Sequence, residues 1–219
     1  MSTRLDIISD PICPWCYIGK ARLEAALQNA PAGVFEIHWH PFQLNPDMPP
    51  EGRDRREYLE GKFGGKEGAV RAYAPVATAA EESGLVMNLE KIARTPNTLD
   101  AHRLIHWAGV EGVQNAVVDA LFDANFVQGL DISDHEVLAD IAEAAGMARA
   151  PTLALLQSDA DRDDIQARDK QAREMGVGGV PCFIVANKYA VEGAQPAETW
   201  ANIIAEIDAL VRGKPDAPN

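Results

Sequence analysis

The sequence is short of cysteine, of positive charge and of long apolar runs, and each shortage excludes a class of protein. Three cysteines in 219 residues are too few for the disulfide framework of a secreted scaffold. The 33 acidic residues outnumber the 20 basic ones, and the net charge of −13 disfavours nucleic acid and anionic membranes as partners. No apolar run approaches the roughly 20 residues that a membrane span needs.

The first residues show no apolar leader ahead of a cleavage site, so the sequence predicts a protein without a signal peptide. We therefore expect a soluble, cytoplasmic protein. In a reducing compartment, two cysteines separated by two residues are more often catalytic or metal-binding than structural. Cys13 and Cys16 form such a pair.

The spacing of apolar residues changes character twice along the chain. Strand-like segments flank a helix that begins near Cys16 and reaches about residue 30. Residues 54–175 are dominated by helical spacing and predict five to seven helices. A β-hairpin with its turn at Asn187-Lys188 and a helix over 196–211 then follow. The predicted strands are 4–8, 34–40, 182–186 and 189–192.

Two helix-start signals and two histidine pairs occur within this pattern. Ser133 and Glu136 form a capping box, and residues 95–98 are typical of the start of a helix. The histidine pairs, each on a single predicted face, provide only half of a metal site. Because polar faces exposed to solvent are far commoner, we expect no metal there. The pairs are His38 with His40 and His102 with His106.

The position of the Cys-x-x-Cys pair, between a strand and a helix, indicates its chemistry. Pro14 suits the first helical turn, and the unpaired N–H groups of that turn favour the thiolate of Cys13. Cys16, one turn further, is the more buried partner. The sequence thus predicts that Cys13 attacks and Cys16 resolves. A zinc site and an inert pair of core residues remain weaker alternatives, since only Cys182 and five histidines are left as ligands.

Four further residues point to a substrate groove beside the dithiol. Trp15 and Tyr17 are expected to shape it. Val180-Pro181, after a glycine-rich turn, is a candidate cis peptide that would turn the Val180 backbone toward an extended substrate. An ordinary trans proline is the commoner reading of an isolated X-Pro.

Five segments of the sequence carry a family resemblance. They are Asp10-Pro11-Ile12-Cys13-Pro14-Trp15-Cys16-Tyr17-Ile18-Gly19, Trp39-His40-Pro41-Phe42-Gln43-Leu44-Asn45-Pro46, Asn97-Thr98-Leu99-Asp100-Ala101-His102-Arg103-Leu104, Gly179-Val180-Pro181 and Gly193-Ala194-Gln195. Together they resemble the FrnE-like branch of the DsbA family. The resemblance implies an α/β protein with a thioredoxin fold (β-α-β … β-β-α) and an inserted all-helical domain. It places residues 1–50 and 176–219 in the thioredoxin-like domain and 51–175 in the insertion, and it implies that Pro181 is cis.

The same branch contains 2-hydroxychromene-2-carboxylate isomerases and kappa-class glutathione transferases, which use a serine where this chain has Cys13. Two cysteines therefore favour a disulfide oxidoreductase with Cys13 and Cys16 catalytic and Pro14, Trp15, Val180 and Pro181 at the substrate. A glutathione-dependent isomerase or transferase is the alternative, and a chaperone-like protein with a vestigial dithiol is a third.

The expected partners are disulfide- or thiol-containing proteins or small molecules. No cofactor is expected, with glutathione as a candidate co-substrate, and related proteins often form homodimers. Cys182 follows the presumed cis proline, where relatives usually carry Phe, Thr or Ala. It is either a small core residue or a candidate third redox thiol.

Overall fold

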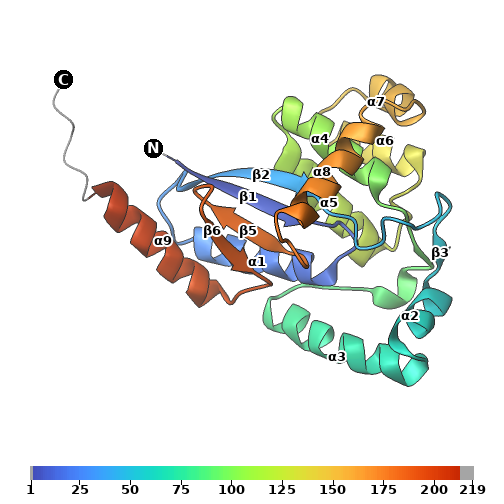
Figure 1. Ribbon diagram of the computed structural model, residues 1–219, viewed down its shortest axis with the longest axis horizontal. Helices are drawn as coiled ribbons and strands as arrows, with labels where there is room; N and C mark the ends of the chain where they lie inside the picture. Colours follow the sequence, from blue (N-terminus) through green and yellow to red (C-terminus); the bar gives the residue numbers. More distant parts are fainter. Residues whose placement is uncertain (1, 213–219) are drawn as a thin grey trace.

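The computed structural model describes residues 2–212, and the side chains of residues 2–209. Its centre is a four-stranded sheet in the order β2-β1-β5-β6 (Figure 1). β1 and β2 are parallel, and the pairs β1–β5 and β5–β6 are antiparallel. This is the sheet of a thioredoxin fold, as predicted. The strands are β1 (Thr3–Ser9), β2 (Phe35–Pro41), β5 (Cys182–Val185) and β6 (Tyr189–Glu192).

The two faces of the sheet are covered by different parts of the chain. Leu5, Ile7 and Phe183 belong to the core that α1 (Pro14–Leu27) and α9 (Ala197–Arg212) cover. Phe183 packs on Trp200 of α9, with ring centroids 4.7 Å apart. Since successive strand residues point to opposite faces, Cys182 and its register partner Ile8 lie on the other face.

Seven α-helices lie between β2 and β5 in the sequence, which is the upper end of the predicted number of five to seven. Figure 1 shows α4 to α8 gathered at one end of the sheet and α2 with α3 set apart from them. The helices are α2 (Arg55–Phe63), α3 (Lys66–Glu82), α4 (Leu99–Val110), α5 (Gln114–Asp123), α6 (His135–Ala144), α7 (Arg149–Leu156) and α8 (Arg162–Glu174), with a 3₁₀ turn η1 (Leu89–Lys91) and a π turn η2 (Ala124–Gln128).

This region is not entirely helical, which corrects one detail of the prediction. β3 (Arg53–Asp54) and β4 (Arg94–Thr95) form a two-stranded ribbon at the base of the α2–α3 hairpin. Such short strands leave no periodicity in a sequence. The apolar core is also continuous across the predicted boundary, because Ile7 of the sheet shares one cluster with Phe122 of α5. The division of the chain into two domains stays a prediction.

Two local predictions were wrong by one residue. Asp134, not Ser133, caps α6, and its carboxylate accepts a hydrogen bond from Glu136 N at 2.8 Å. The hairpin turn is centred on Ala186-Asn187, both with φ near +55°, and Lys188 N donates to Val185 O. The start of α4 after Thr98 is confirmed. Of the described helices, none combines the length and apolar character needed to cross a membrane.

Candidate active site

A tight turn after β1 presents Cys13 at the start of α1. Cys13 is the N-cap residue with an extended backbone (φ −84°, ψ 113°), and Pro14 opens the helix. The Cys13 N–H donates to the carbonyl of Asp10 at 2.9 Å, and the Cys16 N–H donates to the carbonyl of Cys13 at 3.0 Å. Backbone hydrogen bonds therefore hold the two cysteines one helical turn apart.

The two thiols are free and occupy different surroundings. The Cys13 thiol donates to the carbonyl of Val180 at 3.6 Å instead of accepting from the first helical N–H groups. Cys16 is 1% exposed. Burial raises the pKa of the Cys16 thiol well above its usual value, the hydrogen bond with Cys13 raises it further, and the hydroxyl of Ser9 works in the opposite direction. Cys16 is thus an interior thiol that holds its proton strongly.

The Val180–Pro181 peptide bond is cis, and it lies beside the dithiol. Gly19 on α1 makes this closeness possible. A Cβ at Gly19 would lie 3.0 Å from Cγ of Pro181 and 3.3 Å from Cζ of Phe183. A methyl group there would fit only if Pro181, Phe183 or α1 moved by a few tenths of an ångström.

A groove of about 310 Å³ runs beside Cys13. Pro14, Trp15 and Val180 line it, so the structure brings these predicted residues together. Tyr17 does not line the groove, contrary to expectation. It stacks on Phe122 and Phe126, with centroid distances of 5.2 and 5.5 Å, and joins α1 to α5 and η2.

The far wall of the groove comes from α2 and α3, which the sequence analysis did not connect to the dithiol. Arg55 donates to the hydroxyl of Tyr73 at 3.2 Å. Lys62 donates to the hydroxyl of Tyr58 at 2.8 Å. Two cations and two phenols therefore line the same groove as the cysteine. Only the tertiary packing of the hairpin could reveal them, because these residues form no motif with Cys13.

Cys182 lies on the other face of the sheet. It is 4% exposed and packs against Ile8, Phe42 and Ala172. Burial raises the pKa of its thiol, and the negative charge of Glu192 adds to this effect. A redox role for Cys182 stays a prediction.

A buried acid and a buried histidine lie behind the dithiol turn. Asp10 is fully buried, and burial raises its pKa to about 7 although the N–H groups of Leu44 and Ile12 lower it. His102 on α4 is 2% exposed, and burial lowers its pKa to about 4. The expectation that His102 lies on a solvated face is therefore wrong, because α4 packs this side toward the sheet.

The remaining histidines hold polar partners. His38 contacts Glu36 at 3.0 Å, and His40 contacts Asp6 at 2.6 Å. Within residues 2–212, no group of three or more His, Cys, Asp or Glu is arranged to hold a metal ion.

The whole arrangement agrees with a known family of thiol–disulfide oxidoreductases. Residues 4–205 match the family model described as a DSBA-like thioredoxin domain. The chain belongs to the DsbA family. A probable DsbA oxidoreductase from Streptomyces coelicolor has 30% sequence identity and a TM-score of 0.83, over 99% of this chain and 93% of that one.

More distant DsbA-like structures share the fold. A 2-hydroxychromene-2-carboxylate isomerase matches with a TM-score of 0.72 and 17% identity, over 95% of this chain and 98% of that one. The cytosolic disulfide reductase DsbM from Pseudomonas aeruginosa, solved with GSH, matches with a TM-score of 0.66 and 16% identity, over 95% and 99%. At these identities the two likenesses show the fold alone, and the FrnE-like branch stays a prediction.

Proposed function

We propose that this DsbA-family protein is a disulfide oxidoreductase in which Cys13 attacks and Cys16 resolves. The observation that carries the proposal is the contrast between the two thiols. Cys13 borders the groove and contacts the Val180 carbonyl, whereas Cys16 is enclosed behind it and holds its proton strongly. A substrate can therefore reach Cys13 first.

With a disulfide substrate, the Cys13 thiolate attacks one sulfur, the S–S bond breaks, and the first substrate thiolate leaves. Cys16 then loses its proton and attacks Sγ of Cys13, which releases the second substrate thiolate. Two electrons pass from the dithiol to the substrate, and both released thiolates take protons from water. The steps reverse for a thiol substrate, so the reduction potential decides the direction. The exposed side of Val180 offers its backbone to an extended substrate segment.

The test is to trap the mixed disulfide. With Cys16→Ser, a disulfide peptide should remain covalently attached to Cys13, and mass spectrometry should find the adduct there. Cys182→Ser is the matched control and should exchange and release the peptide like the unmodified protein. A Cys16→Ser protein that carries no adduct, or carries it on Cys182, would contradict the proposed roles.

A second candidate is a glutathione-dependent isomerase or transferase, and the groove provides the observation that favours it. Arg55 and Lys62 place positive charge beside Cys13 in a protein of net charge −13. That arrangement suits the carboxylates of glutathione. The candidate predicts saturable glutathione binding, weakened by Arg55→Gln and Lys62→Gln, and activity that survives Cys16→Ser. Arg71→Gln, at an exposed arginine on α3 paired with Glu67, is the charge-matched control.

We further propose that the protein works in the cytoplasm without a tightly bound cofactor, and that it forms a homodimer. A cytoplasmic glutathione pool would keep its dithiol mostly reduced. Fractionation of the producing cells tests the location, and native mass spectrometry of the purified protein tests both the cofactor and the dimer. A double Cys13→Ser, Cys16→Ser variant that still suppresses aggregation as well as the unmodified protein would favour the chaperone-like alternative.

A further inference from the structure

Asp10 is a buried carboxyl group without a neighbouring lysine or arginine in the part of the chain that the structure describes. It lies at the end of β1, and its backbone carbonyl holds the N–H of Cys13. Its side chain accepts hydrogen bonds from Leu44 N at 2.7 Å and from Ile12 N at 3.3 Å. The hydroxyl of Thr98 also bonds it. Neutral donors from three segments thus surround a group that would otherwise carry a charge.

His102 faces this carboxyl with an unused nitrogen. Its Nε2 has no hydrogen-bond partner and lies 3.8 Å from Oδ1 of Asp10. The ring bonds to the backbone of Phe42, which must involve Nδ1 because Nε2 is unpartnered. Nδ1 therefore donates to the Phe42 carbonyl, and Nε2 presents a lone pair to Asp10.

A single proton on Asp10 would satisfy both groups. The protonated carboxyl could donate its O–H to Nε2 after a small approach, since 3.8 Å is too long for the bond as it stands. Another charge nearby favours this neutral state. Asp169 of α8, which Arg173 pairs at 3.0 Å, places a second negative charge near Asp10.

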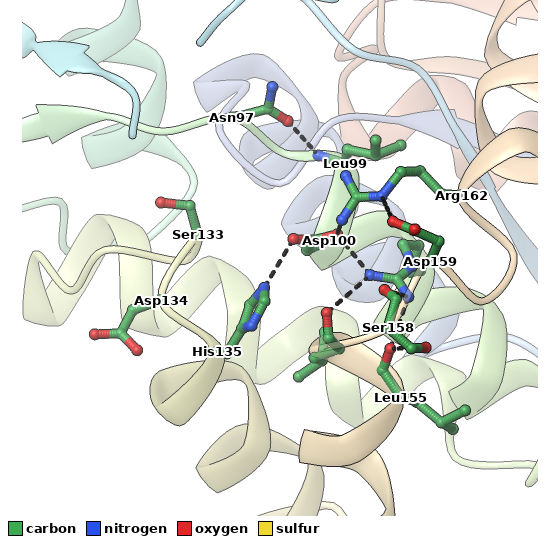
Figure 2. A network of polar contacts seen from close by, with 12 residues as sticks. Asn97, Leu99, Asp100, Ser133, Asp134, His135, Leu155, Ser158, Asp159 and Arg162 are labelled. Atoms are coloured by element: carbon green, nitrogen blue, oxygen red, sulfur yellow. Dashed lines mark hydrogen bonds and ion pairs between the residues drawn. The ribbon is translucent and has the colours of Figure 1, made fainter. Parts of the chain in front are cut away.

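The position of His102 is fixed from the opposite side of α4. Figure 2 shows Asp100 between His135 and Arg162, at 2.9 and 3.2 Å. The buried Arg103 donates to the carbonyls of Leu155 and Ser158 at 2.7 and 2.9 Å. These contacts anchor the start of α4 in the helical region. Thr98 and His102, also at the start of α4, lie against Asp10.

We propose that Asp10 and His102 share one proton behind the dithiol, and that the charge of this pair sets how readily Cys13 and Cys16 ionise. The proposal rests on the proposed function and goes beyond it by assigning both residues a positioning role. When the pair loses its proton, the carboxylate disfavours a nearby thiolate and so destabilises the reduced protein. Because such coupling is reciprocal, oxidation of the dithiol makes Asp10 easier to ionise.

Asp10→Asn tests the pair with an isosteric, permanently neutral side chain whose amide can donate to Nε2. Above about pH 8, its dithiol should be about tenfold easier to reduce in a glutathione buffer than that of the unmodified protein, a shift of ~30 mV. Below about pH 6 the two proteins should agree. Asp140→Asn, at an exposed aspartate on α6 paired with Arg149, is the matched control and should give no pH-dependent difference.

Infrared difference spectra provide a second, independent measurement. The unmodified protein should show a protonated carboxyl band that disappears as the pH rises through about 7 and is absent in Asp10→Asn. His102→Phe, which removes the acceptor, should move that midpoint to lower pH. An Asp10→Asn potential offset by the same amount at every pH, or no carboxyl band between about pH 5 and 8, would overturn the proposal. The infrared measurement needs no thiol–disulfide exchange, so a protein that shows the carboxyl band but exchanges no disulfide would refute only the proposed function.

Discussion

Cys13 and Cys182 are equally enclosed, at 4% exposure each, yet they lie on opposite faces of one sheet and in different surroundings. Cys13 borders a groove of about 310 Å³ and touches the backbone of Val180. Cys182 is packed among Ile8, Phe42 and Ala172. Exposure alone therefore does not identify a reactive thiol. What differs is whether open space and a hydrogen-bonding backbone adjoin the sulfur.

The largest expected difference between the two thiols is in catalysis. Cys13→Ala should reduce thiol–disulfide exchange to the uncatalysed background, because the attacking sulfur is lost. Cys182→Ala should leave the rate within about twofold, since its sulfur is buried among Ile8, Phe42 and Ala172. Stopped-flow reduction of a fluorescent disulfide peptide measures both. A large loss with Cys182→Ala would remove the distinction between the two faces.

The second prediction concerns how the free energy of unfolding depends on pH. Asp10 and His102 should each contribute a pH dependence, and the two contributions should have opposite signs. Folded Asp10 keeps its proton up to about pH 7, whereas the unfolded chain releases it near 3.8, so its contribution falls as pH rises. Folded His102 stays neutral down to about pH 4, whereas the unfolded ring takes a proton below 6.5, so its contribution rises with pH. In the unmodified protein the two slopes nearly cancel.

Replacing either residue should leave only the pH dependence of the free energy of unfolding that the other residue contributes. In His102→Phe, the free energy of unfolding should fall by up to about 4 kcal/mol from about pH 4 to the lowered midpoint of Asp10, which lies below pH 7. In Asp10→Asn, it should rise by about 3 kcal/mol between about pH 4 and 6.5. Urea denaturation at closely spaced pH values measures both, with Cys182→Ala as the control from the other face. Parallel pH profiles in all three variants would show that the pair is not coupled as described.

A smaller effect is expected at the contact between α1 and Pro181. Gly19→Ala should cost about 1–3 kcal/mol and slow exchange, because its Cβ meets Pro181 and Phe183 and displaces the dithiol. Gly61→Ala on α2 is the control, since nothing lies within 4 Å of that Cβ, and it should stabilise the helix slightly. Thermal unfolding measures the stability of both glycine variants, and thiol–disulfide exchange rates measure their activity. A neutral Gly19→Ala would mean that α1 and Pro181 do not depend on this close approach.

The smallest expected effect is that of Cys182→Ala on the free energy of unfolding. Cys182→Ala removes one buried sulfur from a packed cluster and should cost about 1 kcal/mol, with an unchanged reduction potential. Chemical denaturation and glutathione titration check the two quantities. A shifted potential would connect this thiol to the dithiol across the sheet.

Much of the fold and part of the candidate active site could be predicted from local sequence. The order of strands and helices follows from apolar spacing, and the Cys-x-x-Cys pair before a helix identifies the dithiol. The capping residue of α6 and the centre of the hairpin turn were displaced by one residue, because neighbouring polar residues can serve the same local role. His102 was misjudged, since a histidine on a helix gives no sign of which side packs inward.

The sequence by itself determined the thioredoxin order of elements, the pair Cys13–Cys16 and the proline that faces it, because these depend on short-range patterns and a family resemblance. Only the tertiary structure decided which thiol borders a groove, that Arg55 and Lys62 face it, and that His102 meets Asp10 behind the dithiol. Those relations join residues far apart in the chain, and their proximity comes from packing, which no local pattern encodes. The third cysteine illustrates both: the sequence shows that it follows the proline, and the alternation of the strand turns it to the other face.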